Sequence, residues 1–328
     1  MRNARWSTAA GLAALALAGC VGQPFSSKDV GADAAPGAEQ RLVDWGDYPD
    51  FPDVGPIERG GRCEEVIDVV FALDLSSSMT FVLTKLATEI DAVVAASNKL
   101  KEDAHFGLVP FVDNFVIDTA GPLEGGKVHT EAATLRARFE HYRVTYTEAD
   151  RNPGDGPTGP TLQNPICEEN SLDALYAAAT GFPWRETASR VVILVTDDTY
   201  LERPDNYGDR DGDGLTDKTD FPREGDYPAL RTMAEAVDAL RTNRTRVFSF
   251  TRLEPPGPFS LTKCSTGRRL PWESVSDGWS TPYQGQAPIP TRTDGANFDV
   301  ELVRSGQLSL SATINQVVLE SYCDPPIL

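Results

Sequence analysis

The sequence predicts an α/β fold, a doubly wound, mostly parallel sheet with helices on both faces. Two apolar runs have the length of strands: residues 66–73, interrupted only by Asp68, and residues 191–195. Each leads into an aspartate, Asp74 and Asp197 respectively. Continuous apolar runs are typical of central parallel strands that are covered on both faces. Segments with helical periodicity separate them, as expected of a sheet wound with helices.

The remaining elements follow from periodicity along the chain. After the first strand, an apolar residue recurs every three or four positions from Leu83 to Leu100, which predicts a helix. Asn170 or Ser171 can cap a later helix. Further strands are expected at 105–116, with a possible hairpin at 113–114, at 246–251 and at 297–302, and further helices at 130–141, 171–180, 230–240 and 308–322. Residues 152–165 are expected to form a loop, and the pattern does not place 253–295.

Length and charge limit the function. The 328 residues allow one large domain or two small ones, and an apolar content of 40% is enough for a buried core. The formal charge of -19 disfavours nucleic acid and anionic membrane surfaces as partners, because both attract Lys and Arg. Cations are therefore the natural ligands.

The first twenty residues predict export. Arg2 and Arg5 precede an apolar run too short to span a bilayer, and residues 17–20 resemble the bacterial lipobox, in which Cys20 would be lipidated after cleavage. The alternative is an ordinary signal peptide with an accidental cysteine. No later segment is long and apolar enough to span, so we expect a lipid-anchored envelope protein, with Val21 favouring the outer membrane. Residues 21–62 are expected to be a flexible acidic tether.

Four cysteines remain after Cys20, and an exported chain favours their oxidation to disulfides. Three connectivities are possible. Cys63 with Cys323 is favoured because these two bracket the patterned region of 63–323, and Cys167 with Cys264 then follows by elimination. The alternative is that they are unpaired buried thiols.

The aspartates at the strand ends predict a cation site. In open α/β sheets, ligands bind outside the carboxyl ends of the strands, where Asp74 and Asp197 are expected. Two carboxylates at the rim of an apolar sheet repel one another unless a cation lies between them. Ser76 and Ser78 add neutral oxygens to Asp74, a ligand set suited to Mg²⁺. The alternative is that one serine only caps the helix that follows.

These residues resemble the von Willebrand factor A domain, and most closely the version in integrin β subunits. The resemblance covers roughly residues 63–323 and is specific at three separated motifs. The matching segments are Asp74-Leu-Ser-Ser-Ser78 with Met79, Thr196-Asp197, and Glu169 four residues before Asp173-Ala174; the segment 111–115 (FVDNF) also resembles the strand after the first helix.

The resemblance implies a metal-ion-dependent adhesion site on a Rossmann-like fold. Ser76, Ser78 and Glu169 would bind Mg²⁺ or Mn²⁺ directly, and Asp74 and Asp197 directly or through water. One coordination position would remain for a carboxylate of a protein partner. In other members a threonine replaces the glutamate, and the fallback candidates here are Thr158 and Thr161.

The chain departs from integrin β subunits at two neighbouring sites. The acidic residues expected after the methionine are replaced by Thr80-Phe81-Val82, so no adjacent site is expected. Ile166 and Glu168 break the pattern of the third site, although Asn164 fits it.

A second acidic motif has the spacing of a calcium loop of the EF-hand type, within an insert at about 205–222. Glycine at its sixth position permits a sharp turn, and the seventh offers its carbonyl. The predicted ligands are Asp209, Asp211, Asp213, Leu215, Asp217 and Asp220. The alternative is a solvated acidic turn. If Ca²⁺ binds, we expect it to rigidify this insert after Asp197.

Catalysis is not expected. The sequence has no GxSxG elbow and no Gly-rich phosphate loop, and Ser76 stands where a haloacid dehalogenase-type phosphatase needs a second aspartate. The leading hypothesis is a lipid-anchored, Mg²⁺-dependent module that binds a protein partner through an acidic side chain. The alternatives are a metal-dependent hydrolase that uses the same ion and a structural domain with an inherited metal site.

Overall fold

The computed structural model describes residues 63–154, 162–163, 168–203, 229–253 and 275–323. The predicted signal peptide with Cys20, the tether, the calcium loop, Cys167 and Cys264, Thr158 and Thr161, and Asn164 and Ile166 lie outside these residues.

The core of the domain is a five-stranded sheet in which every pairing is parallel, as predicted for an α/β fold. Across the sheet the order is β2-β1-β3-β4-β5. The strands are β1 (Val66–Asp74), β2 (His105–Phe111), β3 (Ala188–Val195), β4 (Thr245–Thr251) and β5 (Asn297–Asp299). The apolar runs of β1 and β3 pair centrally with Leu73 opposite Val195, so both strands end at the same edge.

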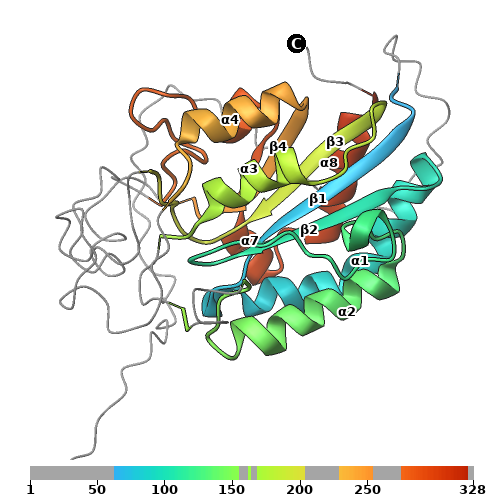
Figure 1. The fold of residues 1–328 in the computed structure, drawn as a ribbon, viewed down its shortest axis with the longest axis horizontal. Coiled ribbons are helices and arrows are strands. Elements are labelled where there is room, and N and C mark those ends of the chain that lie inside the picture. The colour runs from blue at the N-terminus through green and yellow to red at the C-terminus, as the bar shows by residue number, and fades with distance from the viewer. Residues whose placement is uncertain (1–62, 155–161, 164–167, 204–228, 254–274, 324–328) are drawn as a thin grey trace, which may run out of the picture. The chain divides into compact units, whose positions relative to one another are not determined.

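Helices cover both faces of the sheet (Figure 1). Successive side chains of a strand point to opposite faces, so the strands contribute to two core clusters, one under each layer of helices. One core cluster includes Phe71 and Leu73 and is covered by α1 (Thr80–Leu100), α2 (Ala132–Tyr142), α7 (Val300–Ser305) and α8 (Leu310–Cys323). The opposite cluster includes Val70 and Ala72 and is covered by α3 (Ser171–Gly181), α4 (Met233–Thr242) and α6 (Ile289–Arg292). Short turns η1 (Ser77–Met79), η2 (Glu124–Gly126) and η3 (Arg143–Thr147) complete the described elements.

Two predicted strands are shorter than expected. The strand predicted at 105–116 ends at Phe111. The chain then reverses at 113–114, as the possible hairpin there had anticipated, with an antiparallel bridge between Phe111 and Phe115, and runs back along β2. The strand predicted at 297–302 ends at Asp299, because the Asp299 carboxylate accepts a hydrogen bond from the Glu301 amide (2.9 Å) and starts α7. Capping by a local side chain therefore overrides the strand pattern.

The helix predicted from residue 230 begins later, at Met233. Thr232 and Glu235 form a reciprocal capping box that sets this start. Leu230 lies outside the helix and is 48% exposed.

A disulfide joins Cys63, just before β1, to Cys323 at the end of α8, which confirms the favoured pairing. The backbone amide of Glu64 also donates to the Tyr322 carbonyl (2.9 Å). The two ends of the described domain are thus held together. None of the helices in the described ranges combines the length and apolar character needed to cross a membrane.

Candidate cation site

The predicted site lies at the point where the sheet changes its direction of winding. β1 is followed by α1 on one face, whereas β3 leads to α4 on the other face. The loops after these two neighbouring strands therefore diverge, and ligands bind in α/β proteins at such a switch point. Asp74 is the last residue of β1, and Thr196 and Asp197 directly follow β3.

Asp74 is held by two short hydrogen bonds from neighbouring chain segments. Its Oδ1 accepts from the Ser76 amide (2.7 Å), and its Oδ2 accepts from the Thr196 hydroxyl (2.8 Å). The side chain is buried. Its position is therefore set both by the turn after β1 and by the end of β3.

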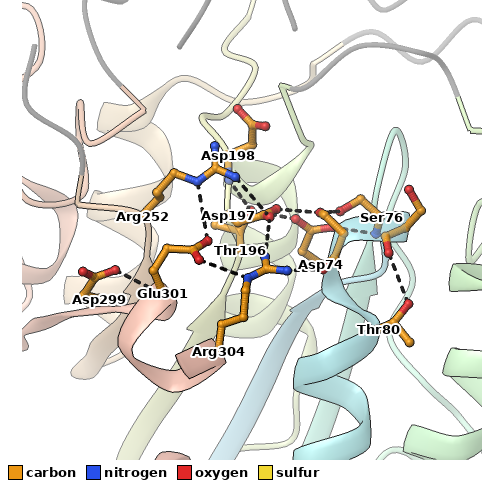
Figure 2. Close-up of polar contacts among 12 residues, drawn as sticks. Asp74, Ser76, Thr80, Thr196, Asp197, Asp198, Arg252, Asp299, Glu301 and Arg304 are labelled. Carbon is orange, nitrogen blue, oxygen red and sulfur yellow. Dashed lines mark hydrogen bonds and ion pairs between the residues drawn. The ribbon is translucent and has the colours of Figure 1, made fainter. Parts of the chain in front are cut away.

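The serines complete the link between the two strand ends (Figure 2). Ser78 Oγ donates to Asp197 Oδ1 (2.8 Å), and Ser76 Oγ lies 3.1 Å from Ser78 Oγ. The helix begins with Met79 in the cap position and has no side-chain cap bond, so neither serine caps α1. Four of the five predicted Mg²⁺ ligands are thus linked by hydrogen bonds: Ser76, Ser78 and Asp197 through side-chain oxygens, and Asp74 through the Ser76 amide.

Glu169, the fifth predicted ligand, is held beside the segment that follows β3 by backbone pairing with Thr199 and Leu201. Its amide donates to the Thr199 carbonyl (3.0 Å), and its carbonyl accepts from the Leu201 amide (3.1 Å). The residue is 4% exposed, and among the described residues its Oε2 has no hydrogen-bond partner. The next residue, Asn170, donates through Nδ2 to the Asp113 carbonyl (3.1 Å). The sequence had suggested Asn170 or Ser171 as a cap of α3; Asn170 occupies the cap position, but no side chain forms a cap hydrogen bond there.

Burial and mutual repulsion raise the pKa values of the carboxyl groups in this region. Burial, and then the charge of Asp197, raise the pKa of Asp74 to about 7. Burial, followed by the charges of Asp74 and other nearby aspartates, raises the pKa of Glu169 well above its usual range. The pKa of Asp198 is likewise raised by burial and by Asp197. A divalent cation would relieve both the burial cost and the repulsion.

The donor chemistry fits a hard cation. Carboxylate and hydroxyl oxygens are the ligands that Mg²⁺ accepts, and Oε2 of Glu169 is a buried acceptor to which no described residue donates. In the part of the chain that the structure describes, no three His, Cys, Asp or Glu side chains are grouped so as to hold a metal. A cation here would therefore depend on the serine hydroxyls together with the carboxylates.

Two arginines and a glutamate at the rim were not predicted (Figure 2). Asp197 Oδ2 lies 3.2 Å from Arg304 Nη2 and 3.5 Å from Arg252 Nη2. Glu301 Oε2 lies 3.1 Å from Arg304 Nε. Arg252 directly follows β4. Because ligands bind outside the carboxyl ends of parallel strands, the reasoning that indicated Asp74 could also have indicated Arg252. The sequence held no comparable signal for Arg304, because it lay outside the predicted elements and the first half of the short helix that carries it was predicted as strand.

No family model matches the chain, and no curated protein matches its sequence. Among solved structures, it is similar to an aerotolerance-related membrane protein from Bacteroides fragilis, with 16% identity over 77% of this chain and 99% of that one and a TM-score of 0.40. It is also similar to the conserved hypothetical protein BatB from Bacteroides thetaiotaomicron, with 14% identity over 78% and 98% of the two chains and a TM-score of 0.40. Similarities at this level concern the fold alone and assign no ligand or activity.

Proposed function

We propose that this chain is a von Willebrand factor A-type module that is lipid-anchored in the bacterial cell envelope and binds a carboxylate of a protein partner through Mg²⁺. The observation that carries the proposal is the hydrogen bond between Ser78 and Asp197, which are 119 positions apart and lie at the ends of two different strands. It supports a shared site at the switch point of the sheet.

The charge and exposure of the candidate ligands support this role. Asp74 and Asp197 are buried, whereas Ser78 is exposed and Ser76 is half-buried. An ion held by these buried carboxylates and by the more exposed hydroxyls would keep positive charge accessible to solvent. An acidic side chain of a partner is the ligand that such an ion would attract.

Substituting Ser78 with alanine should weaken Mg²⁺ binding by at least about tenfold, because it removes one oxygen ligand and its contact with Asp197. Ser77→Ala is the matched control, because Ser77 is an exposed neighbour outside the predicted ligand set. Isothermal titration calorimetry with MgCl₂ measures both variants. Equal Mg²⁺ affinity in the two variants, or no binding to the unsubstituted protein, would refute the proposed site.

The partner chemistry can be tested by capture from envelope extract. The protein should retain a partner in Mg²⁺ and lose it in EDTA, and Ser78→Ala should retain less than Ser77→Ala. Blocking the carboxyl groups of the extract with a carbodiimide and an amine should abolish capture. Capture that survives this blocking contradicts carboxylate recognition. Hydrolysis of phosphoesters or peptides that disappears with Asp74→Ala would instead favour a metal-dependent hydrolase.

A further inference from the structure

Arg304, on α7, contacts three other segments in or next to the candidate cation site. Its Nη2 lies 3.2 Å from Asp197 Oδ2 after β3, and its Nη1 lies 3.5 Å from the Ser78 carbonyl in η1. Its guanidinium carbon lies 4.0 Å from the centre of the Phe81 ring in α1. One side chain therefore contacts both segments that carry the candidate ligands.

This contact belongs to a ring of charges at the rim, which Figure 2 shows from one side. Arg304 and Arg252 both face Oδ2 of Asp197, and both also face Glu301, at 3.1 Å and 3.8 Å. The Asp197 side chain is only 4% exposed, whereas the Arg304 side chain is 37% exposed. The carboxylate end of the pair is thus shielded from solvent, which strengthens its interaction with nearby charges.

The position of α7 depends in part on this ring. Its first residue, Val300, and Val303 are buried, but the helix has only six residues and Leu302 is 38% exposed. A helix of this length gains little stability from its own backbone hydrogen bonds and relies on tertiary contacts. Arg304, one residue before its end, is the polar contact that ties it to Asp197 and Ser78.

We propose that Arg304 is an arginine latch: it competes with a divalent cation for Asp197, so that cation binding and docking of α7 at the site oppose each other. The inference rests on the function proposed above and names the regulation of that site. A cation bound among Ser76, Ser78 and Asp197 would share the Asp197 carboxylate with the Arg304 guanidinium, and both are positively charged. Like charges on one buried carboxylate disfavour each other's binding.

Coupling of this kind is reciprocal. If Arg304 lowers cation affinity by some factor, cation binding must loosen the Arg304 contact by the same factor. The measurable consequences are therefore a change in Mg²⁺ affinity when the arginine is removed and a change in the dynamics of α7 when Mg²⁺ is added.

Arg304→Gln should increase the affinity for Mg²⁺ about tenfold, within the range of typical couplings between sites, as measured by calorimetry at about pH 8. The matched control is Arg241→Gln, which makes the same charge change at an exposed position in the last turn of α4. The second readout is hydrogen exchange of the α7 amides. Mg²⁺ should accelerate it in the unsubstituted protein but leave it unchanged in Arg304→Gln.

The outcomes separate the two proposals. If all three proteins bind Mg²⁺ with one affinity, or if Arg304→Gln binds it more weakly, the latch is overturned while the cation site stands. If Mg²⁺ slows exchange in α7, the predicted opposition is wrong in sign. If the unsubstituted protein and Arg304→Gln both fail to bind Mg²⁺, the latch and the proposed function fall together.

Discussion

Without divalent cations, raising the pH from about 5 to about 8 should lower the free energy of unfolding by several kcal/mol, and Mg²⁺ should restore it. The cause is the group of buried carboxylates at the ends of β1 and β3. The pKa of Asp74 is raised to about 7, and the pKa values of Glu169 and Asp198 are also raised by burial and by neighbouring acidic groups.

The sign follows from proton linkage. An aspartate of the unfolded chain ionises near pH 4, so below that pH both states are protonated and the group's full contribution to stability is present. As the pH rises through the higher pKa of the folded state, that contribution is lost. For Asp74 alone the full loss, between about pH 4 and pH 7, is on the order of 4 kcal/mol, and about 3 kcal/mol of it falls above pH 5. Mg²⁺ at about 100 times its dissociation constant would return about 3 kcal/mol.

Urea unfolding followed by circular dichroism, in EDTA and in Mg²⁺ at both pH values, measures this effect. Asp74→Asn is the control variant, because an amide cannot ionise and is a poorer ligand for Mg²⁺. It should reduce both the pH dependence and the gain from Mg²⁺. Equal stability of the cation-free protein at both pH values would show that these carboxylates are not electrostatically strained.

Replacing Asp118 with alanine should destabilise the domain by about 3–5 kcal/mol, independently of any cation. This buried carboxylate follows β2 and accepts hydrogen bonds from Arg138 Nε (2.8 Å) and Nη2 (2.6 Å), the Tyr142 hydroxyl (2.5 Å) and the Ala120 amide (2.8 Å). His129 Nε2 lies 3.8 Å away. Removing the carboxylate leaves the Arg138 guanidinium and the Tyr142 hydroxyl of α2 without this acceptor.

The matched control is Asp91→Ala. Asp91 also pairs with an arginine of α2, Arg136, but its side chain is 68% exposed. Exposed ion pairs contribute less than about 1 kcal/mol. Chemical unfolding should therefore separate the two variants by at least about 2 kcal/mol. A loss for Asp118→Ala no larger than that for Asp91→Ala would show that the buried network is dispensable.

Asp118 also sets the acid limit of stability. Burial alone would raise its pKa, but contacts from His129, Tyr142 and Ala120 and the charge of Arg138 hold its pKa well below the usual range. A lowered pKa contributes stability above about pH 4, and this is lost as the pH falls further. The cation-free protein should therefore be most stable in mildly acidic solution, between the windows in which Asp118 and Asp74 titrate.

The amino-acid sequence alone predicted the sheet and the grouping of Asp74, Ser76, Ser78 and Asp197. Apolar runs long enough for a strand predicted β1 and β3, because burial on both faces imposes a composition that can be recognised without a structure. The aspartates that end these runs were predicted to meet because parallel neighbours finish at one edge. Ser76, Ser78 and Asp197 form connected contacts as expected, whereas Glu169 was indicated only by a family resemblance.

The charged residues that surround this group could be identified only in the folded protein. Arg304 and Asp197 are 107 positions apart, and the helix that carries Arg304 is too short for its periodicity to stand out. Asp118 reaches Arg138 and Tyr142 because the chain reverses after β2. Apolar periodicity records which side of an element is buried, but an ion pair depends on the reach and direction of two side chains, and these arise only when distant elements dock.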